Sequence, residues 1–155
     1  MPLLQLSIDL AAGVANSEKR GVAFLSGVPE LNARPTFNAV ASESVGKRIR
    51  HRMGLWIQFH PDTPGKFHGF TKYETKYRSC FTFIDIEEKI RYYGFRCHPK
   101  PDNPRYELVV LTSCVDKKED AVNKAALDRV LMWKNNMATQ QALKEFVEKE
   151  LGKKK

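Results

Sequence analysis

Residues 77–97 read YRSCFTFIDIEEKIRYYGFRC, and this stretch decides the fold. Its two ends, residues 77–84 and 89–97, are rich in aromatic and β-branched side chains, which is typical of strands. The acidic segment 85–88 between them has the length and polarity of a hairpin loop. We therefore expect two antiparallel strands here.

Further strands are expected on both sides of this hairpin. Residues 105–114 read RYELVVLTSC and follow a segment with three prolines, which ends the preceding ladder. Residues 55–59 read LWIQF and alternate with a period of two, so they predict another strand before a turn at 60–65. Neighbouring strands with short connections form an antiparallel meander.

Helical patterns flank this predicted sheet. Leu6, Leu10 and Val14 recur at helical spacing and predict a short helix over residues 3–16. Residues 22–25 are a short strand or a second helix fragment, and residues 27–44 are expected to connect, because prolines interrupt them. Residues 44–53 predict a short basic helix.

The C-terminal third predicts two helices or one bent helix. Asp116 and Glu119 form a capping-box-like start, and apolar stripes follow over 122–133 and 143–151. The expected fold class is α+β: a small twisted antiparallel sheet of three to four strands in a meander, flanked by N-terminal and C-terminal helices. Residues 1–45 are expected to form an N-terminal extension, and residues 46–155 the α+β domain.

Positive charge is concentrated in the middle of the chain. The formal net charge is +8, and residues 46–106 carry 13 Lys and Arg against 6 Asp and Glu. A basic surface attracts phosphate backbones by counterion release and electrostatic steering. The alternative is that the charge only keeps the protein soluble. A partner that carries phosphate is the favoured interpretation.

Cysteine usage and known motifs exclude several classes. Cys80, Cys97 and Cys114 are odd in number and lack paired spacing, so they indicate neither a disulfide framework nor a zinc site, and a reducing cytoplasm is expected. The longest apolar stretch, residues 10–15, is too short to span a membrane, and the N-terminus does not resemble a signal peptide. No nucleophile elbow, P-loop or dinucleotide fingerprint occurs. We expect no metal and no cofactor.

Two basic segments are candidates for contact with nucleic acid. The run GKRIRHR, residues 46–52, is a phosphate contact, a solvated helix face or a site for an acidic partner. The run KIRYYGFR, residues 89–96, places Lys89, Arg91 and Tyr93 on one strand face, and a meander brings Lys117 and Lys118 close to them. Cations beside tyrosines can clamp a phosphodiester and stack bases; the alternative is an ordinary solvated sheet face. For the histidines in turns there are two interpretations: they act as general acids or bases, or they are simply solvated.

The order of these pieces resembles a known family. A strand, a hairpin to KIRYYGF and then ELVVLTSCVDKKEDAVNKAALDRV, over about residues 77–131, is similar to the second half of the RelE/ParE-type toxins of bacterial toxin–antitoxin modules, including the HigB-like group. The resemblance implies a small twisted sheet packed against helices and ribosome-dependent mRNA cleavage without a metal. The resemblance also implies that Arg91 matches the family's strand arginine, which contacts phosphate. Lys117 or Lys118 would match the family's basic residue after the last strand.

The leading hypothesis is therefore a toxin-like, RNA-acting cytoplasmic protein, a metal-independent endoribonuclease with RNA or the ribosome and an acidic antitoxin as partners. The alternative is a non-catalytic module of RelE-like fold that binds nucleic acid or protein. The candidate catalytic residues are Arg91, Lys117, Lys118 and Tyr93, with Tyr93 stacking on a base. The candidate RNA-binding residues are Lys89, Arg96, Arg78, Lys47, Arg48, Arg50 and Arg52.

Overall fold

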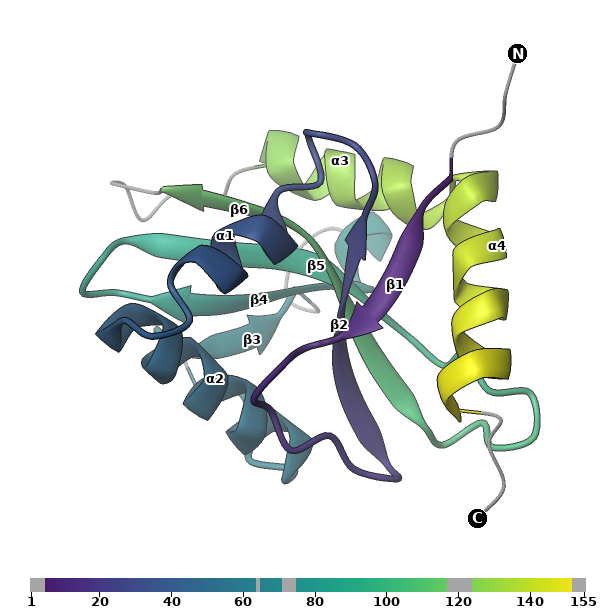
Figure 1. Cartoon of the computed structure of the whole chain (residues 1–155), viewed down its shortest axis with the longest axis horizontal. Coiled ribbons are helices and arrows are strands. Elements are labelled where there is room, and N and C mark those ends of the chain that lie inside the picture. Colours follow the sequence, from purple (N-terminus) through teal and green to yellow (C-terminus); the bar gives the residue numbers. More distant parts are fainter. Residues whose placement is uncertain (1–4, 64, 71–74, 117–123, 152–155) are drawn as a thin grey trace.

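The computed structural model describes residues 5–63, 65–70, 75–116 and 124–151. Along these segments strands and helices follow one another in an α+β arrangement (Figure 1). The elements are β1 (Ser7–Leu10), β2 (Arg20–Ser26), α1 (Ala33–Ala39), α2 (Ser44–Ile57), β3 (Phe67–Gly69), a 3-10 turn (Thr75–Tyr77), β4 (Cys80–Asp85), β5 (Ile90–Cys97), β6 (Glu107–Asp116), α3 (Lys124–Lys134), α4 (Met137–Phe146) and a π-helical turn (Val147–Leu151).

The strands form one mixed sheet of six strands in the order β1-β2-β6-β5-β4-β3. The hairpin and the following strand are confirmed, because β4, β5 and β6 pair antiparallel in sequence order. The predicted sheet of three to four strands in a meander is wrong. β2 adds to β6 in parallel, and β1 and β3 extend the two edges. A parallel neighbour needs a crossover: α1 and α2 lead from β2 to β3 at the opposite edge of the sheet, and β4, β5 and β6 then return to β2.

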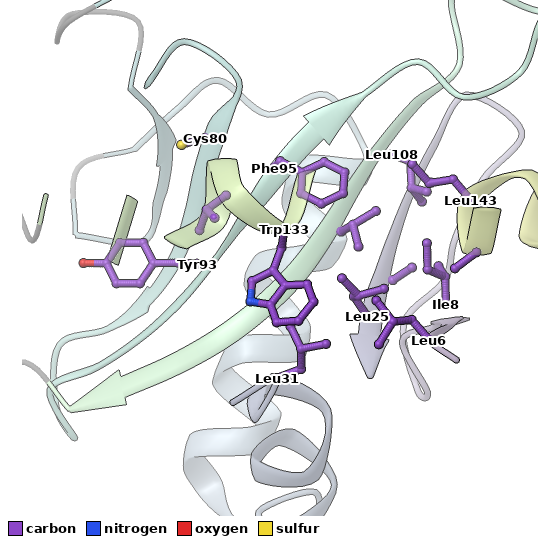
Figure 2. Close-up of a cluster of buried hydrophobic side chains, with 14 of the residues drawn as sticks. Leu6, Ile8, Leu25, Leu31, Cys80, Tyr93, Phe95, Leu108, Trp133 and Leu143 are labelled. Carbon is purple, nitrogen blue, oxygen red and sulfur yellow. The ribbon is translucent and has the colours of Figure 1, made fainter. Parts of the chain in front are cut away.

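Helices cover both faces of the sheet (Figure 1). α1 and α2 bury Phe37, Ile49, Met53 and Trp56 against one face. α3 and α4 pack Val130, Trp133 and their neighbours against the other, together with Tyr93 and Phe95 of β5 (Figure 2). The sheet is therefore buried on both sides, which explains why its central strands are nearly continuous apolar runs.

The N-terminal segment departs from the sequence-based expectation. The predicted helix over 3–16 is wrong, because Ser7–Leu10 is a strand. Leu6 and Ile8 are buried while Ser7 is exposed, so the strand period of two prevails over the helical spacing of the leucines. Of the two interpretations of residues 22–25, the strand is confirmed as part of β2. β1 and β2 lie within residues 1–45, the expected N-terminal extension, and both belong to the sheet.

The segment between β2 and β3 is more helical than expected. Residues 33–39 form α1 where a connection is predicted, since Pro35 lies in the first helical turn, whose amides need no partner within the helix. The basic helix is confirmed as α2, but it runs on to Ile57. The predicted strand at 55–59 is therefore wrong. Ile49, Met53 and Trp56 follow helical spacing and bury one face of α2. The alternation of apolar and polar side chains over residues 55–59 is too short to outweigh this helical pattern.

The C-terminal third contains the two predicted helices. Asn136 caps α4 by accepting a hydrogen bond from the Ala138 amide at 2.8 Å. The capping-box start predicted at Asp116 and Glu119 involves side chains outside the described residues. Within the part of the chain that the structure describes, no helix is long and apolar enough to cross a membrane.

Candidate functional site

Of the residues that the sequence grouped as catalytic, Arg91 and Tyr93 lie in the part of the chain that the structure describes. Arg91 lies on β5 opposite Val115 of β6, near the sheet end. Tyr93 is 1% exposed, so its predicted role as a base-stacking residue is wrong. Its ring centroid lies 6.5 Å from that of Phe70. Tyr93 belongs to the core between the sheet and α3, where Figure 2 shows it. Burial raises the pKa of Tyr93, and the nearby Arg91 charge partly opposes that rise.

The remaining members of that predicted cluster are lysines. Lys117 and Lys118 lie outside the described residues. Lys89 is exposed in the β4–β5 turn, in a left-handed conformation with φ 54°. Among the described members of this predicted cluster, the cations are thus Arg91 on β5 and Lys89 in the turn before it.

The basic run of α2 is divided between intramolecular and exposed positions. Arg48 and Arg52 both bind the fully buried carboxylate of Asp85, and Arg52 also donates to the carbonyl of Ile84. Their guanidinium groups therefore serve an ion pair inside the protein, and their role as RNA-binding residues stays a prediction. Lys47 is exposed and Arg50 half-buried, so both remain predictions.

Arg78 and Arg96, by contrast, meet at an open pocket of about 370 Å³. They come from the segment before β4 and from the end of β5. Hairpin pairing brings these segments together, since the Arg96 amide donates to the Ser79 carbonyl at 2.7 Å. The pocket is lined by Thr75, Lys76, Arg78, Ser79, Arg96, His98 and Lys134.

Contacts with α3 fix the segment that supplies Arg78. The Tyr77 hydroxyl donates to Asp128 Oδ1 at 2.7 Å, and the Lys76 ammonium lies 3.8 Å from the same oxygen. Lys134, the last residue of α3, donates from Nζ to Ser79 Oγ at 3.1 Å. The pocket is thus built from three separate segments held by hydrogen bonds, not from a flexible loop alone.

The electrostatics of the pocket favour an anion. Arg96 Nε lies 3.7 Å from Glu107 Oε2, and Asp128 faces Lys76, so these two cations are partly balanced. Arg78 is exposed, and neither it nor Lys134 is within ion-pair distance of a carboxylate among the described residues. Two cations therefore remain for a ligand, beside the hydroxyls of Thr75 and Ser79, which is the donor set that a phosphate requires.

His98 adds a titratable group to the rim of this pocket. Its Nδ1 lies 3.1 Å from the Tyr106 carbonyl oxygen, which can only accept a hydrogen bond. Nδ1 therefore carries the proton, and in the neutral ring Nε2 is left with a free lone pair. The ring is exposed at the edge of the pocket.

Sequence reasoning found only part of this site. Arg78 and Arg96 are predicted RNA-binding residues, and the hairpin register could have shown that they are neighbours. Sequence patterns do not identify Lys134, because it lies 55 residues along the chain from Ser79 and only the packing of α3 brings the two together. His98 was considered only among several turn histidines. Its fixed tautomer depends on the Tyr106 carbonyl, which no local pattern reveals.

The described residues contain no group of three or more His, Cys, Asp or Glu side chains arranged to hold a metal ion. No protein-family model matches the chain, and none of the curated proteins or solved structures compared with it is a match. Function must therefore be argued from the pocket and its surroundings.

Proposed function

We propose that the protein binds RNA and holds a backbone phosphate in the pocket formed by Arg78, Ser79, Arg96 and Lys134. The observation that carries this proposal is the convergence of Arg78 and Lys134, which have no carboxylate partner among the described residues, on one hollow with two hydroxyl groups. Paired cations beside hydroxyl donors suit the oxygens of a phosphodiester. The excess charge of residues 46–106 extends the attraction beyond the pocket.

RNA is proposed as the phosphate carrier because of the resemblance to RelE/ParE-type toxins. The order of β4, β5, β6 and α3 is the order that this resemblance implies over residues 77–131, and it supports the proposal. An acidic protein partner is the competing ligand for the same cations. It differs from RNA in lacking nucleobases and closely spaced phosphates.

Binding is tested by fluorescence anisotropy with a labelled single-stranded RNA of about 12 nucleotides, over a series of salt concentrations. The double variant Arg78→Ala/Lys134→Ala should weaken binding at least tenfold and reduce the slope of log K against log salt by about one to two, because two phosphate contacts are lost. The matched control is Arg129→Ala/Lys144→Ala, which removes the same charges from exposed positions on α3 and α4.

The RNA affinity of the control variant should stay within about threefold of that of the wild type. Equal losses in the two double variants would reduce the pocket to one part of a diffuse charge and contradict the assignment. A wild-type protein that shows no salt-dependent binding to RNA would refute the proposed function itself.

Metal-independent RNA cleavage is a second candidate, and His98 favours it. Its Nε2 can take the proton of a 2′-hydroxyl, whose oxygen attacks the adjacent phosphorus while the bond to the 5′-oxygen breaks. Arg78 and Lys134 would stabilise the charge that develops on the phosphorane, and the departing 5′-oxygen takes a proton from water. The products are a 2′,3′-cyclic phosphate and a 5′-hydroxyl end.

The cleavage candidate is tested by incubating RNA with the wild type and with His98→Gln in the presence of EDTA. We expect cyclic phosphate ends with the wild type and a loss of at least a hundredfold in rate with the variant. Expression in bacteria should arrest growth and fragment mRNA only with the wild type, as expected of a toxin. Intact RNA in both assays would leave the protein as a binding module.

A further inference from the structure

The C-terminus of α2 carries an aromatic residue where glycine is usual. The amide of His60 donates to the carbonyl of Leu55 and the amide of Phe59 to that of Trp56, both at 3.0 Å, which is the Schellman pattern of helix ends. Phe59 occupies the left-handed position of this motif with φ 67°. Glycine dominates this position because a Cβ is disfavoured there.

Burial does not explain why a phenylalanine occupies that position. The Phe59 side chain is 52% exposed, so much of its ring faces solvent. A residue held in a disfavoured conformation and also exposed gains little stability from its own packing. Backbone strain of this kind concentrates at binding and switch regions.

A cation fixes the orientation of the Phe59 ring. The guanidinium carbon of Arg20 lies 4.1 Å from the centroid of Phe59 and 4.5 Å from that of Trp56. Arg20 is itself anchored, because its Nη1 donates to the Trp56 carbonyl at 2.7 Å. Phe59 is thus the outermost member of a ring–cation–ring stack, in which Trp56 is buried and Phe59 is half-exposed.

The same arginine connects this stack to the basic pocket. Arg20 Nη2 lies 3.6 Å from Glu107 Oε1, and Glu107 Oε2 lies 3.7 Å from Nε of Arg96, which lines the pocket. Arg20, Glu107 and Arg96 therefore form a continuous series of charged side chains. An exposed aromatic ring stands at one end of this series and the phosphate-binding cations at the other.

We propose that Phe59 is a base-stacking subsite, and that the ligand of the pocket is therefore single-stranded RNA. This inference rests on the proposed function and adds the form of the nucleic acid to it. A base that is unpaired and unstacked from its neighbours offers a free face to an aromatic side chain, whereas a duplex hides both faces of each base. Stacking on a ring tolerates any base, so the subsite selects strandedness rather than sequence.

The test measures the affinity of each variant for a single-stranded RNA and for a duplex of the same sequence. The single strand contains 2-aminopurine, whose fluorescence reports stacking. Phe59→Ala should weaken single-strand binding by about tenfold and remove the fluorescence change. Phe59→Tyr keeps a ring and should stay within about twofold of the wild type. Duplex affinity should be the same for all three proteins.

Two further variants separate stacking from folding and from general hydrophobicity. Phe59→Gly suits the left-handed backbone, so it should fold normally while losing single-strand affinity like Phe59→Ala. Met137→Ala removes a side chain that is 88% exposed on α4 and should bind like the wild type. Equal single-strand affinity of Phe59→Gly and the wild type would overturn the subsite.

The two proposals fail in different ways. If Arg78→Ala/Lys134→Ala loses RNA while Phe59→Gly does not, the phosphate pocket stands and the stacking subsite is wrong. If the wild type binds neither form of RNA, both are wrong. Stronger binding to the duplex than to the single strand would also overturn the inference about strandedness.

Discussion

Arg48 donates from Nε and Nη2 to the two carboxylate oxygens of Asp85, at 2.7 and 3.0 Å, and so ties α2 to the end of β4. The carboxylate is fully buried, and it also accepts from Arg52 and from the amide of Glu88. Asp85 thereby fixes the start of the β4–β5 turn as well as the helix. A bidentate guanidinium pair of this kind depends strongly on geometry.

Replacing Asp85 with asparagine should destabilise the fold. The substitution keeps the volume but removes the buried counter-charge of Arg48 and Arg52, and Arg48 retains only the exposed carboxylate of Glu87. Removing one partner of a buried pair costs about 3 kcal/mol. Urea denaturation measures the change in unfolding free energy. Glu87→Gln is the matched control, because its carboxylate pairs with Arg48 but is 70% exposed, and it should change stability by less than about 0.5 kcal/mol. Equal effects of the two would contradict this account.

The same carboxyl should make stability depend on acid. Burial alone would raise the pKa of Asp85, but the hydrogen bonds from Arg48 and the Glu88 amide and the charges of Arg48 and Arg52 outweigh it, so the net shift is downward. The unfolded state then binds more protons, and stability rises with pH in this range. The contribution is complete above a pH of about 4 and is lost as the pH falls through the folded pKa. Urea midpoints of the wild type and Asp85→Asn should converge as the pH falls below about 4; a constant gap would refute this.

Alanine should destabilise the fold at Gly94 and stabilise it at Gly54. A Cβ at Gly94 would lie 2.1 Å from the Val110 carbonyl oxygen, next to the irregularity in the β5–β6 register. The two central strands would have to separate, so we expect a loss of at least about 3 kcal/mol or failure to fold. A Cβ at Gly54 of α2 meets nothing within 4 Å, and alanine there should add up to about 1 kcal/mol. Thermal melts of both variants test the pair, and a neutral Gly94→Ala would contradict the packing.

Asn32 should be required to complete the edge of β6. Its side chain donates to the Cys114 carbonyl at 3.0 Å and accepts from the Cys114 amide at 2.8 Å, beyond the point where β2 stops pairing. Asn32→Ala removes both bonds and should cost about 1–3 kcal/mol. Asn38→Ala, at an exposed position of α1, should cost less than about 0.5 kcal/mol. Chemical denaturation of the two variants would contradict this role if their stabilities matched.

The thiol of Cys80 should be unreactive in the folded protein. Burial raises its pKa to about 12, against an ordinary value of 9.0, while Lys134 opposes the rise. At pH 8 the thiolate is then about a thousand times scarcer than for an ordinary thiol. Reaction with Ellman's reagent should be slow in the native protein and fast in guanidinium chloride, with peptide mapping to identify the labelled residue. Rapid labelling of native Cys80 would be inconsistent with its burial.

Sequence patterns predicted the secondary structure correctly where a single local preference, for strand or for helix, was strong. Residues 80–97 carry their own strand preference and turn, and the hairpin is confirmed. Sequence patterns were insufficient at Trp56 and Ile57, where strand-like alternation and helical spacing of the apolar residues compete over a short stretch. Burial of Trp56 against Phe81 and Phe83, far along the chain, favours the helix. The same competition explains why the N-terminal leucines form a strand: β1 is held by β2 and covered by α4.

The sequence by itself determined the α+β class, the central hairpin, the basic middle of the chain and the helical C-terminal third, because propensity, periodicity and charge act over short distances. Only the tertiary structure decided that β2 joins β6 in parallel and that Tyr93 is buried, and it alone assigned Arg48 and Arg52 to Asp85. It also brought Lys134 to Arg78 and Arg96. These outcomes depend on pairing and desolvation between distant segments.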